Sequence, residues 1–519
     1  MLVVGLCACN NPASLTENQD KPEEATFSLS ELASDYYLED TVRIGIAAYP
    51  DTFLPYLADN IPEQEPLVLI YDQLFSYGLD FKLEGKLVKS YTISEDGLHY
   101  SFELKDDIFF HDGSKLTADD VIFTINLIRD RANASPLNDK FQYIESISKQ
   151  DDLMFSLTLK QAYARFLNAL TIYIMPQTAF LKDPLALANQ PIGTGAYQFK
   201  QGDGQKSFIL EVNDNYWQPI ANIDYLEFCV ISEATDRLIA IDNKELDLII
   251  GGLLAADVDR LTENVDNSNV VIEQSISTTY EYLGFMLNHT PLDDVRVRQA
   301  IAYALDKDLL TAEMQGYRSM VSLPHGHWAT NDLDINSYDI DLQFASELLE
   351  EAELSLPCVI TLSCTANRLE LAELIKEQLA EIKIIIDIVV LEPEEFVQEM
   401  CLQNMMIYLH GWAEQYDPDQ STIFVSTEIP DSGANRNGYT NLKIDDIYKE
   451  ARMTADVSLR RDMYQQAWQI MIGDEASFIP IYTPRHLVAY NGLLSGLVVA
   501  PYPIGTLRSL AIAKMTAIE

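Results

Sequence analysis

The stretch HGWAEQYDPDQ, His410 to Gln420, holds a tryptophan, a tyrosine and three carboxylates within eleven residues. It directly follows the apolar run MMIYL. Carboxylates at such spacing could bind a metal ion, act as acid and base in hydrolysis, or receive a cationic group. The two aromatic rings would add apolar walls with polar edges. The rest of the chain decides between an active site, a metal site and a socket for a cation.

The common catalytic signatures do not occur in this chain. GxSxG, HExxH and the phosphate loop GxxxxGK[ST] are all missing. GTGAY, Gly193 to Tyr197, lacks the third glycine and the preceding strand of a dinucleotide loop, which favours a simple turn. His111 and Asp112 adjoin at a glycine turn, where an aspartate usually bonds the backbone instead of orienting a histidine. We therefore predict neither an enzyme nor a cofactor.

The histidines of PHGHW, His325 and His327, are the pair that suggests a metal site. They lie two apart, so an extended chain would point both to one side. No cysteine or glutamate stands at ligand spacing beside them. A structural loop is therefore favoured, and no metal site is predicted.

The charge of the chain excludes one class of partner. Its 519 residues include 35 Lys and Arg against 80 Asp and Glu, a formal net charge of -45. Such a field repels phosphate backbones, so no nucleic acid partner is predicted. A solvated surface is the favoured explanation of this acidity, ahead of the steering of cationic ligands. Six cysteines without a CxxC pair indicate neither a zinc ribbon nor a disulfide framework, and Cys358 and Cys364 are expected as packed thiols.

Hydrophobic patterns predict a mixed α/β chain of two to four lobes, because one core rarely serves a chain of this length. TVRIGIA, from Thr41, alternates as a strand should and opens the fold. Short strands follow from Lys86, with turns at Asp96-Gly97 and Asp112-Gly113. Further strands are predicted at SFILEVND, YLEFCVI, LDLIIGG, VITLSC and IKIIIDIVVLE.

Helices are predicted from apolar spacing and from end signals. PLVLIYDQLFSYGLD predicts a helix that ends near Tyr77 and Gly78. Thr117 and Asp120 form a capping box, so a second helix begins at Ala118. Two amphipathic helices are predicted in LDDVRVRQAIAYALDKDLL and DVSLRRDMYQQAWQIMIGD. Their apolar faces comprise Val297, Ile301 and Leu305 in the first, and Leu459, Met463, Ala467 and Ile470 in the second.

The stub MLVVGLCAC precedes a polar, acidic stretch that looks like a flexible tether. LCAC resembles the lipobox of bacterial lipoproteins, in which the cysteine, here Cys9, receives diacylglycerol. No Lys or Arg precedes the apolar part, which is short for a signal segment. Residues 1–9 are predicted as a truncated lipoprotein signal and 10–40 as the tether. A plain truncated apolar end is the alternative.

Several longer stretches together resemble one family, the extracellular solute-binding proteins of oligopeptide, dipeptide and nickel ABC importers. They occur in the family's order and run from about Thr41 to Tyr482. The most specific is the segment from DGLHYSF to FHDGSKLTADDV. The others include PIGTGAYQFK, NDNYW, LGFMLNHTPLDDVRVRQAIAYALDKDLL, GWAEQYDPDQ and NGYTNLKIDDIYKEA.

The resemblance implies an α/β chain with a two-lobed, periplasmic-binding-protein-like fold of type II. An extra domain would be inserted in the first lobe, and the lobes would close like a hinge over a ligand. By this likeness lobe I comprises 41–66, 192–281 and 487–519. The inserted domain comprises 67–191, and lobe II comprises 282–486.

In many peptide-binding members of the family the text around Trp412 reads W-x-A-D-Y, and the aspartate pairs with the α-ammonium of the peptide. Here that position is Gln415, which lacks the charge-assisted part of the contact. Either Glu414 or Asp417 takes over this role, or the ligand has no free amine. Trp412 and Tyr416 are expected as walls of the socket, with packing inside the lobe as the alternative.

The resemblance assigns two further segments to the site. In RNGYTN, Tyr439 would touch the ligand or the opposite lobe, and Arg436 would either meet a carboxylate or stay exposed and unpaired. AAYPDTF places Tyr49, Pro50 and Asp51 in a loop that in peptide binders bonds the ligand main chain as an added strand would.

Together these features predict a substrate-binding lipoprotein of an ABC importer, held at the outer face of the cell membrane, or at its periplasmic side if the source has two membranes. It would capture short peptides and deliver them to a permease with ATPase subunits. We expect a monomer that meets the membrane only through its lipid anchor. The alternatives are a receptor for peptide pheromones and a binder of nickel chelates or oligosaccharides.

Overall fold

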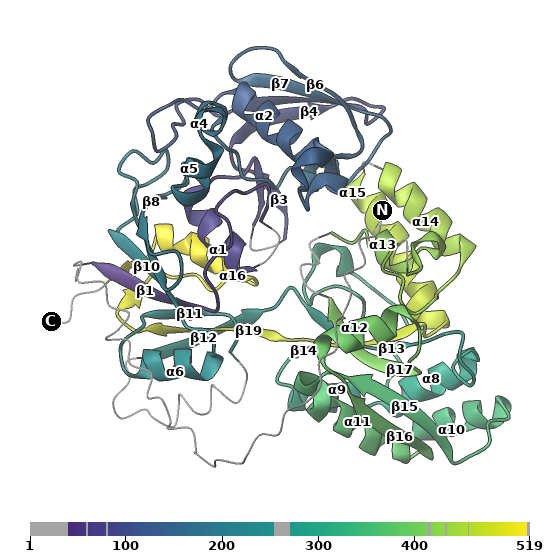
Figure 1. Cartoon of the computed structure of the whole chain (residues 1–519). Coiled ribbons are helices and arrows are strands. Elements are labelled where there is room, and N and C mark those ends of the chain that lie inside the picture. Colours follow the sequence, from purple (N-terminus) through teal and green to yellow (C-terminus); the bar gives the residue numbers. More distant parts are fainter. Residues whose placement is uncertain are drawn as a thin grey trace, which may run out of the picture.

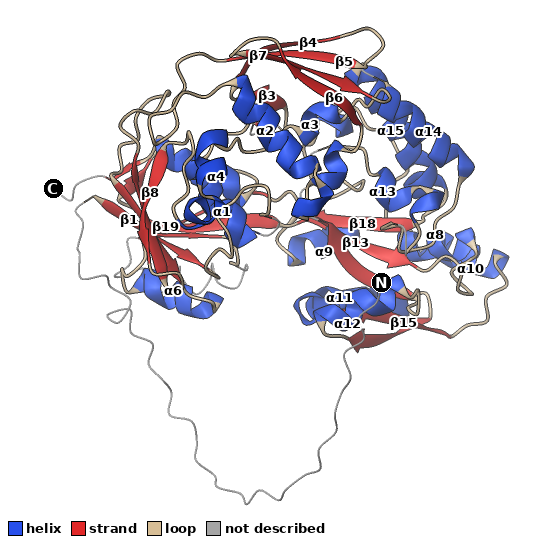
Figure 2. Cartoon of the chain, turned by 45° about the horizontal axis from the view of Figure 1, so that its top comes forward, coloured by secondary structure: helices blue, strands red, loops and turns tan. Residues whose placement is uncertain are grey.

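The computed structural model describes residues 40–58, 61–78, 81–253, 270–412, 417–430, 433–454 and 456–515. Three larger sheets organise this part of the chain (Figure 1). The first lies at the left of the view, the second at the lower right, and the third at the top. Helices and strands are interspersed throughout (Figure 2), so the predicted mixed α/β class is confirmed.

The first body forms around a seven-stranded sheet of order β12-β19-β11-β1-β10-β9-β8 in the described residues. β1 runs parallel to β10 and β11 on either side of it, so its apolar side chains are buried. Helices α1 and α16 pack together over one face, while α6 covers β11 and β19. The bounds are β1 Thr41–Ile46, β8 Tyr197–Gly202, β9 Ser207–Val212, β10 Tyr225–Val230, β11 Leu248–Ile250, β12 Val270–Ile276, β19 Arg485–Asn491, β20 Leu494–Ser495, β21 Lys514–Met515, α1 Ile61–Ile70, α6 Ala234–Asp242 and α16 Pro503–Arg508.

The second body forms around a six-stranded sheet of order β14-β18-β13-β17-β15-β16 in the described residues. Helices α8, α10 and α11 build the core on one face of this sheet, and α12, α14 and α15 build a second core on the other. The bounds are β13 Tyr280–Phe285, β14 Tyr317–Arg318, β15 Cys358–Cys364, β16 Ile384–Val390, β17 Ile407–Trp412, β18 Phe478–Thr483, α8 Val295–Ala304, α9 Lys307–Glu313, α10 Leu342–Glu351, α11 Leu369–Ala380, α12 Pro393–Cys401, α13 Ser421–Phe424, α14 Leu442–Met453 and α15 Val457–Trp468.

The third body forms around the antiparallel sheet β4-β5-β7-β6, which packs on α2. Its strands are short and joined by tight turns, as the Asp-Gly pairs predict. The bounds are β2 Phe75–Tyr77, β3 Leu83–Gly85, β4 Val88–Ile93, β5 His99–Leu104, β6 Ile144–Lys149, β7 Met154–Leu159, α2 Ala118–Arg129, α3 Phe166–Ala169, α4 Gln177–Lys182 and α5 Pro184–Asn189.

Two neighbouring crossings join the first and second bodies. β12 of the first sheet leads through residues 277–279 into β13 of the second, and β18 returns through Pro484 into β19. The N–H of Ser277 donates to the Pro484 carbonyl oxygen at 3.0 Å, so the crossings are bonded to each other. β12 pairs with β19, and β13 pairs with β18, on either side of this bond. A two-stranded ribbon therefore runs from one sheet into the other.

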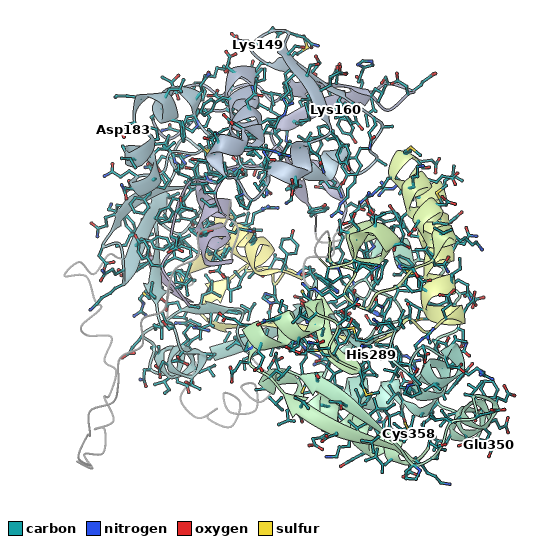
Figure 3. All side chains as sticks on the ribbon, turned by 45° about the vertical axis from the view of Figure 1, so that its right-hand side comes forward. Lys149, Lys160, Asp183, His289, Glu350 and Cys358 are labelled. Carbon is teal, nitrogen blue, oxygen red and sulfur yellow. The ribbon has the colours of Figure 1, made fainter. Side chains whose placement is uncertain are left out.

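Local signals located most of these elements correctly. The strands predicted at Thr41, SFILEVND, YLEFCVI, LDLIIGG, VITLSC and IKIIIDIVVLE are all present. α2 begins at Ala118 as predicted, and the Asp120 carboxylate accepts from the Thr117 N–H at 2.9 Å. Cys358 and Cys364 are free thiols in β15, and Figure 3 shows Cys358 at the outer edge of the second body.

The helix predicted to end near Tyr77 is wrong at both ends. α1 begins at Ile61 and ends at Ile70, and Phe75–Tyr77 forms strand β2 instead. The reason is pairing with a distant segment, because the Leu74 N–H donates to the Ile172 carbonyl at 3.1 Å. The apolar residues after Ile70 are thus buried by neighbouring strands and loops, which a local periodicity does not reveal.

The two predicted amphipathic helices need correction, the first at its end and the second in its apolar face, although Val297, Ile301 and Leu305 are buried as predicted. α8 ends at Ala304, and Leu305 is the extended residue that follows it. In α15 the predicted Leu459 is exposed, whereas Arg460 is buried. Arg460 turns inward because it pairs with the buried Asp417, so the helix presents a charged residue where the pattern predicts only apolar ones.

Candidate functional site

A cavity of about 820 Å³ lies between the three bodies. The first body contributes the loop at Tyr56, helix α1 and the C-terminal helix α16. The third body contributes the end of α2 and residues 163–173, and the second contributes residues near α13 and the end of α14. Because all three bodies supply wall residues, any change in their spacing changes the cavity.

Tyrosines and amides make up about a third of the described wall of this cavity. Aromatic rings offer apolar surface at low entropic cost and a hydroxyl for hydrogen bonds, while amides can donate and accept. The tyrosines are Tyr56, Tyr77, Tyr143, Tyr163, Tyr173 and Tyr502, and the amides are Gln64, Gln73, Gln142 and Asn168. Such a wall suits a ligand with alternating apolar and polar groups.

Two arginines of the wall belong to an ion-pair network. Arg452 Nε lies 3.1 Å from Asp419 Oδ2, and Arg165 Nη1 donates to the Asp419 carbonyl at 3.0 Å. Asp417 lies 3.1 Å from Arg460 and accepts from the Asn168 side chain at 2.9 Å. The network joins residues 165–168 of the third body to residues 417–460 of the second.

Asp417, one of the predicted ligand residues, is buried inside this network. Burial alone would raise the pKa of its carboxyl, but Arg460 and Arg165 outweigh that effect and hold the pKa below its ordinary value. Its charge is therefore already matched by protein groups. In this arrangement Asp417 positions the chain between the bodies.

Trp412 and Arg436 are brought together at a small side pocket of the second body, which adjoins the main cavity at Ala434. The Arg436 guanidinium lies 4.8 Å from the centre of the Trp412 indole and donates to His410 Nε2 at 3.0 Å. Burial, helped by the charges of Arg368 and Arg436, lowers the pKa of His410 to about 3, so this ring is neutral and accepts. Arg436 is half-buried, and it forms no ion pair with a carboxylate among the described residues.

Tyr439 lies close in sequence but turns away from that pocket. Its hydroxyl donates to Glu475 Oε2 at 2.7 Å, and its ring is buried in the core around α14. Burial, with the Glu475 charge, raises the pKa of this phenol above its ordinary value. Tyr439 thus holds the segment that carries Arg436.

Tyr49, Pro50 and Asp51 belong to the loop that follows β1 of the first body. The Tyr49 ring packs edge-on against Phe53 and Phe208, and Asp51 is exposed. Among the described residues that line the cavity, none comes from this loop before Pro55. The predicted Glu414, Gln415 and Tyr416, together with Cys9, lie outside the described residues.

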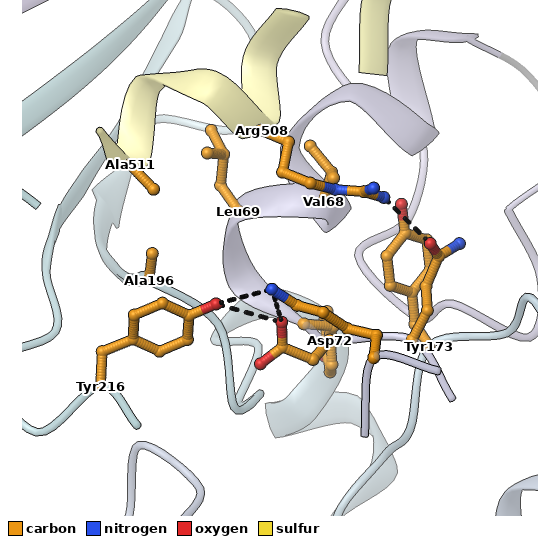
Figure 4. A pocket seen from close by; sticks show the side chains of 11 residues that line it. Val68, Leu69, Asp72, Tyr173, Ala196, Tyr216, Arg508 and Ala511 are labelled. Carbon is orange, nitrogen blue, oxygen red and sulfur yellow. Dashed lines mark hydrogen bonds and ion pairs between the residues drawn. The ribbon is translucent and has the colours of Figure 1, made fainter. Parts of the chain in front are cut away.

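A second side pocket opens between α1, the end of α16 and Ala196, which directly precedes strand β8 (Figure 4). Buried Asp72 accepts from the Trp217 indole at 2.8 Å, and Lys86 Nζ lies 3.6 Å from its carboxylate. Burial lowers the pKa of Lys86, although Asp72 partly offsets this. The pocket shares Gln73, Tyr173 and Arg508 with the main cavity.

The motifs set aside in the sequence have structural partners. Asp112 Oδ1 accepts from the Ser114 N–H at 2.9 Å, which confirms the turn at that position. His111 Nδ1 accepts from the Gly193 N–H at 3.2 Å, so the ring braces the GTGAY turn. His327 Nδ1 accepts from the Ala329 N–H at 3.1 Å. Within the described ranges no cluster of three or more His, Cys, Asp or Glu is placed to hold a metal ion.

A family model described as Bacterial extracellular solute-binding proteins, family 5 Middle, matches residues 82–428, which is more than half of the chain. The chain belongs to this family. The predicted family is thus confirmed, and membership makes the protein a solute-binding protein of the extracellular type and not an enzyme. In the described ranges, the helices are all too short or too polar to traverse a bilayer.

Individual family 5 proteins are similar over nearly the whole chain. Heme-binding protein A of Haemophilus influenzae is 25% identical, with 96% of this chain and 95% of the relative covered. The oligopeptide-binding protein AppA of Bacillus subtilis is 26% identical, with 82% and 84% covered. The crystal structure of the ABC transporter substrate binding protein CtaP from Listeria monocytogenes matches with a TM-score of 0.84 at 24% identity, covering 92% and 99%. This likeness confirms the predicted two-lobed fold.

Sequence reasoning missed most of the cavity wall. Gln73, the Arg165–Asn168 segment and Arg508 come from three distant places in the chain and line one cavity only in the fold. No spacing signal joins them. The tyrosine content, 27 residues in all, is a compositional hint that carries no position.

Proposed function

We propose that this protein is the substrate-binding component of an ABC importer, and that it captures short peptides and delivers them to a permease with ATPase subunits. The observation that carries the proposal is the cavity of about 820 Å³, walled by all three bodies. Its volume falls within the range of about 300–1,000 Å³ that is usual for ligand sites. A cavity of this kind can enclose a ligand from several sides.

Peptides fit the chemistry of the wall. Their main chain alternates donors and acceptors, which the amides and tyrosine hydroxyls can meet, while varied side chains can lie against aromatic rings. The two side pockets, at Trp412 and at Asp72, have room for about one water molecule each, so the peptide itself is assigned to the main cavity. The name of the Bacillus subtilis relative, an oligopeptide-binding protein, supports the same ligand class.

The proposed lobes follow the sequence-based division. Lobe I comprises 41–66, 192–281 and 487–519, lobe II comprises 282–486, and 67–191 is the inserted domain. Support comes from the sheets, because the first sheet is assembled from β1, β8 to β12 and β19, and the second from β13 to β18. Lobe II would then swing about the paired crossings near Ser277 and Pro484.

Closure around ligand is the proposed mechanism. A ligand shifts the equilibrium between open and closed states only by binding the closed state more tightly. Wall residues of lobe II, such as Thr422 and Arg452, meet a ligand together with those of lobe I only when the lobes are close. The permease would recognise this closed form.

The proposed ligand contacts include the segment that leads from Trp412 through Glu414, Gln415 and Tyr416. Trp412 and Arg436 form a wall there, and the ion pairs of Asp417 anchor the segment's far end. Tyr439 would act indirectly, by holding the segment that carries Arg436. The loop of Tyr49, Pro50 and Asp51 would also act indirectly, by supporting the chain between β1 and the wall residue Tyr56. Cys9 would carry the lipid that holds the protein at the outer face of the membrane.

The direct test is to identify what the protein carries. The protein is purified without denaturant, then denatured, and the released small molecules are identified by mass spectrometry. We expect peptides of roughly two to eight residues, in keeping with an enclosed cavity of ordinary size. Recovery of metal chelates or sugars alone would refute the peptide proposal.

A second candidate ligand is haem. The similarity to heme-binding protein A extends over 96% of this chain, and tyrosines of the cavity wall offer phenol oxygens to an iron. Titration with haemin, followed by the Soret band, distinguishes the two ligands. A saturating, stoichiometric shift that a Tyr173→Phe or Tyr77→Phe variant abolishes would favour haem.

A further inference from the structure

Arg508 is a guanidinium in the cavity wall that makes no ion pair with any carboxylate in the described part of the chain. It stands at the end of α16 and lines both the main cavity and the pocket beside Asp72. Its Nη2 donates to Gln73 Oε1 at 3.1 Å and its Nη1 to the Tyr77 carbonyl at 3.5 Å. Figure 4 shows the guanidinium beside Tyr173. Arginine has five N–H donors, so several remain for a ligand.

In lacking a carboxylate partner among the described residues, Arg508 differs from the other two arginines of the cavity wall. With 80 acidic residues to 35 basic ones, carboxylates are abundant enough to neutralise every cation. The other two arginines of the wall follow that rule, because Arg165 and Arg452 both contact the 417–419 segment. An unmatched guanidinium in the wall of a cavity has a preference for an anionic group.

The position of Arg508 is set by the fold. Leu507 and Leu510, on either side of it in sequence, are buried in the core of the first body. The Tyr502 hydroxyl donates to the Tyr77 carbonyl at 2.9 Å, which ties the start of α16 to β2. The guanidinium is therefore held near one place, as a planar bidentate contact to a carboxylate requires.

The second body's part of the wall carries a carboxylate that, like Arg508, has no ion-pair partner among the described residues. Glu428, at the end of the 3-10 turn Ser426–Glu428 of the second body, lines the cavity and is half-buried. It forms no ion pair with a described cation. Asp139, the other carboxylate among the described wall residues, is exposed and stands next to Lys140 in the sequence.

We infer that the cavity is polarised, and that it selects a peptide whose free carboxylate bonds Arg508 and Gln73 while its ammonium faces Glu428. This inference rests on the proposed function and names the chain ends as the recognised groups. A positive group on lobe I and a negative group on lobe II would each be neutralised by one end of the same ligand. Such a ligand gains both contacts only when the lobes are together.

The test uses synthetic peptides of three to five residues with mixed side chains, supplied as free acids and as C-terminal amides in equal amounts. The full chain, freed of endogenous ligand, is incubated with the mixture and passed through a gel filtration column, and retained peptides are quantified by mass spectrometry. The wild-type protein should retain free acids over amides by about tenfold or more, since a charge-assisted contact is lost in the amide. Arg508→Gln should bring that ratio close to one, and Arg508→Lys should restore part of it.

Two further variants complete the design. Arg461→Gln removes a half-buried arginine that pairs with Asp462 outside the cavity wall, and it should keep the wild-type ratio. Glu428→Gln should leave the acid-to-amide ratio intact but abolish the preference for free over acetylated amino termini. The ratio is measured within one sample, so a partly unfolded variant still reports it.

The outcomes separate the two proposals. If the wild-type protein retains acids and amides equally, or if Arg508→Gln keeps the wild-type ratio, the polarised cavity is overturned while peptide binding stands. If the wild-type protein retains no peptide of either kind, the proposed function fails, and the present inference fails with it.

Discussion

The guanidinium of Arg165 lies 3.9 Å from the carboxylate of Asp417, and the two residues belong to different bodies. Arg165 precedes α3 of the third body, whereas Asp417 follows β17 of the second. The Ala164 N–H also donates to the Arg452 carbonyl at 2.7 Å. These contacts join the second and third bodies at a site distinct from the paired crossings near Ser277. The cavity is therefore bordered by the paired crossings on one side and by these contacts on another.

Removing Arg165 should weaken these contacts between the second and third bodies. Arg165→Gln eliminates the charge that spans the two bodies but leaves Asp417 paired with Arg460, so the fold itself should persist. The Arg165 side chain is 37% exposed, and solvent screening limits the loss to about 1 kcal/mol. We expect a larger radius of gyration for the ligand-free variant in solution scattering and weaker ligand binding. Arg461→Gln is the control, and an unchanged radius would mean that the pair does not hold the bodies together.

Trp412 and Glu414 are expected to contribute to ligand binding. Trp412→Ala combined with Glu414→Gln removes an aromatic wall and a carboxylate of the proposed contact segment. The measurement is the rise in unfolding temperature on addition of a peptide recovered from the native protein, which depends on affinity. We expect a clearly smaller rise than in the wild type. Leu459→Ala, at an exposed position of α15, serves as control. An unaltered rise in the double variant would place the site elsewhere.

Acid should destabilise the protein through buried histidines. Burial lowers the pKa of His111 and His486 to about 4, and burial with two nearby arginines lowers that of His410 to about 3. The unfolded chain has histidine pKa values of about 6.5, so below that pH it binds more protons than the folded state. The contribution of these three neutral histidines to the free energy of unfolding is fully present above about pH 6.5. It is lost as the pH falls towards 4 and 3, by up to about 1.4 kcal/mol per histidine and pH unit.

Urea unfolding at pH 7, 6 and 5 measures this effect. His486→Gln removes one of the three groups, and the free energy of unfolding should then fall less steeply with decreasing pH. His99→Gln changes an exposed histidine and should keep the wild-type slope. Equal slopes in the wild type and the His486 variant would contradict the assignment.

Gly193 should tolerate no side chain. A Cβ at this position would overlap the carbonyl oxygen of Ile70, which is backbone at the end of α1 and has little room to move. Gly193→Ala should therefore lower the free energy of unfolding by about 3 kcal/mol, at the upper end of the usual cost of overpacking. Gly113→Ala meets open space and suffers only the strain of a φ near 82°, so a loss of about 1 kcal/mol is expected. A loss in Gly193→Ala no larger than in Gly113→Ala would show that the turn adapts.

Strands were easier to predict than helix ends or the cavity wall. β9, β10, β15 and β16 are short apolar runs bounded by turns, and their burial follows from composition alone. The segment after Ile70 misled the periodicity because its partner, residues 170–174, is a hundred residues away. Arg460 misled it because its charge is met by Asp417. Both errors arise from long-range contacts.

Two residues that the sequence assigns to the site lie next to each other in the structure. Trp412 and Arg436 do come together, because β17 delivers one to the pocket where the Asn435–Tyr439 segment delivers the other. Arg508 could not be assigned, since its place depends on the packing of α16 against α1 across the whole length of the chain. Whether a charged residue is neutralised is a property of its neighbours in space, and spacing along the chain does not report it.

The hydrogen bond between the Ser277 N–H and the Pro484 carbonyl joins the two crossings, so both would have to bend together. Crossings joined in this way would allow the lobes to rotate about one axis, whereas sliding or twisting of the lobes would strain the paired strands. The wall residues would then move along a fixed arc, and the size of the bound ligand would determine how far the lobes close. In the transport role proposed for this chain, a membrane partner that recognises the degree of closure would distinguish the ligand-bound protein from the ligand-free one without contacting the ligand.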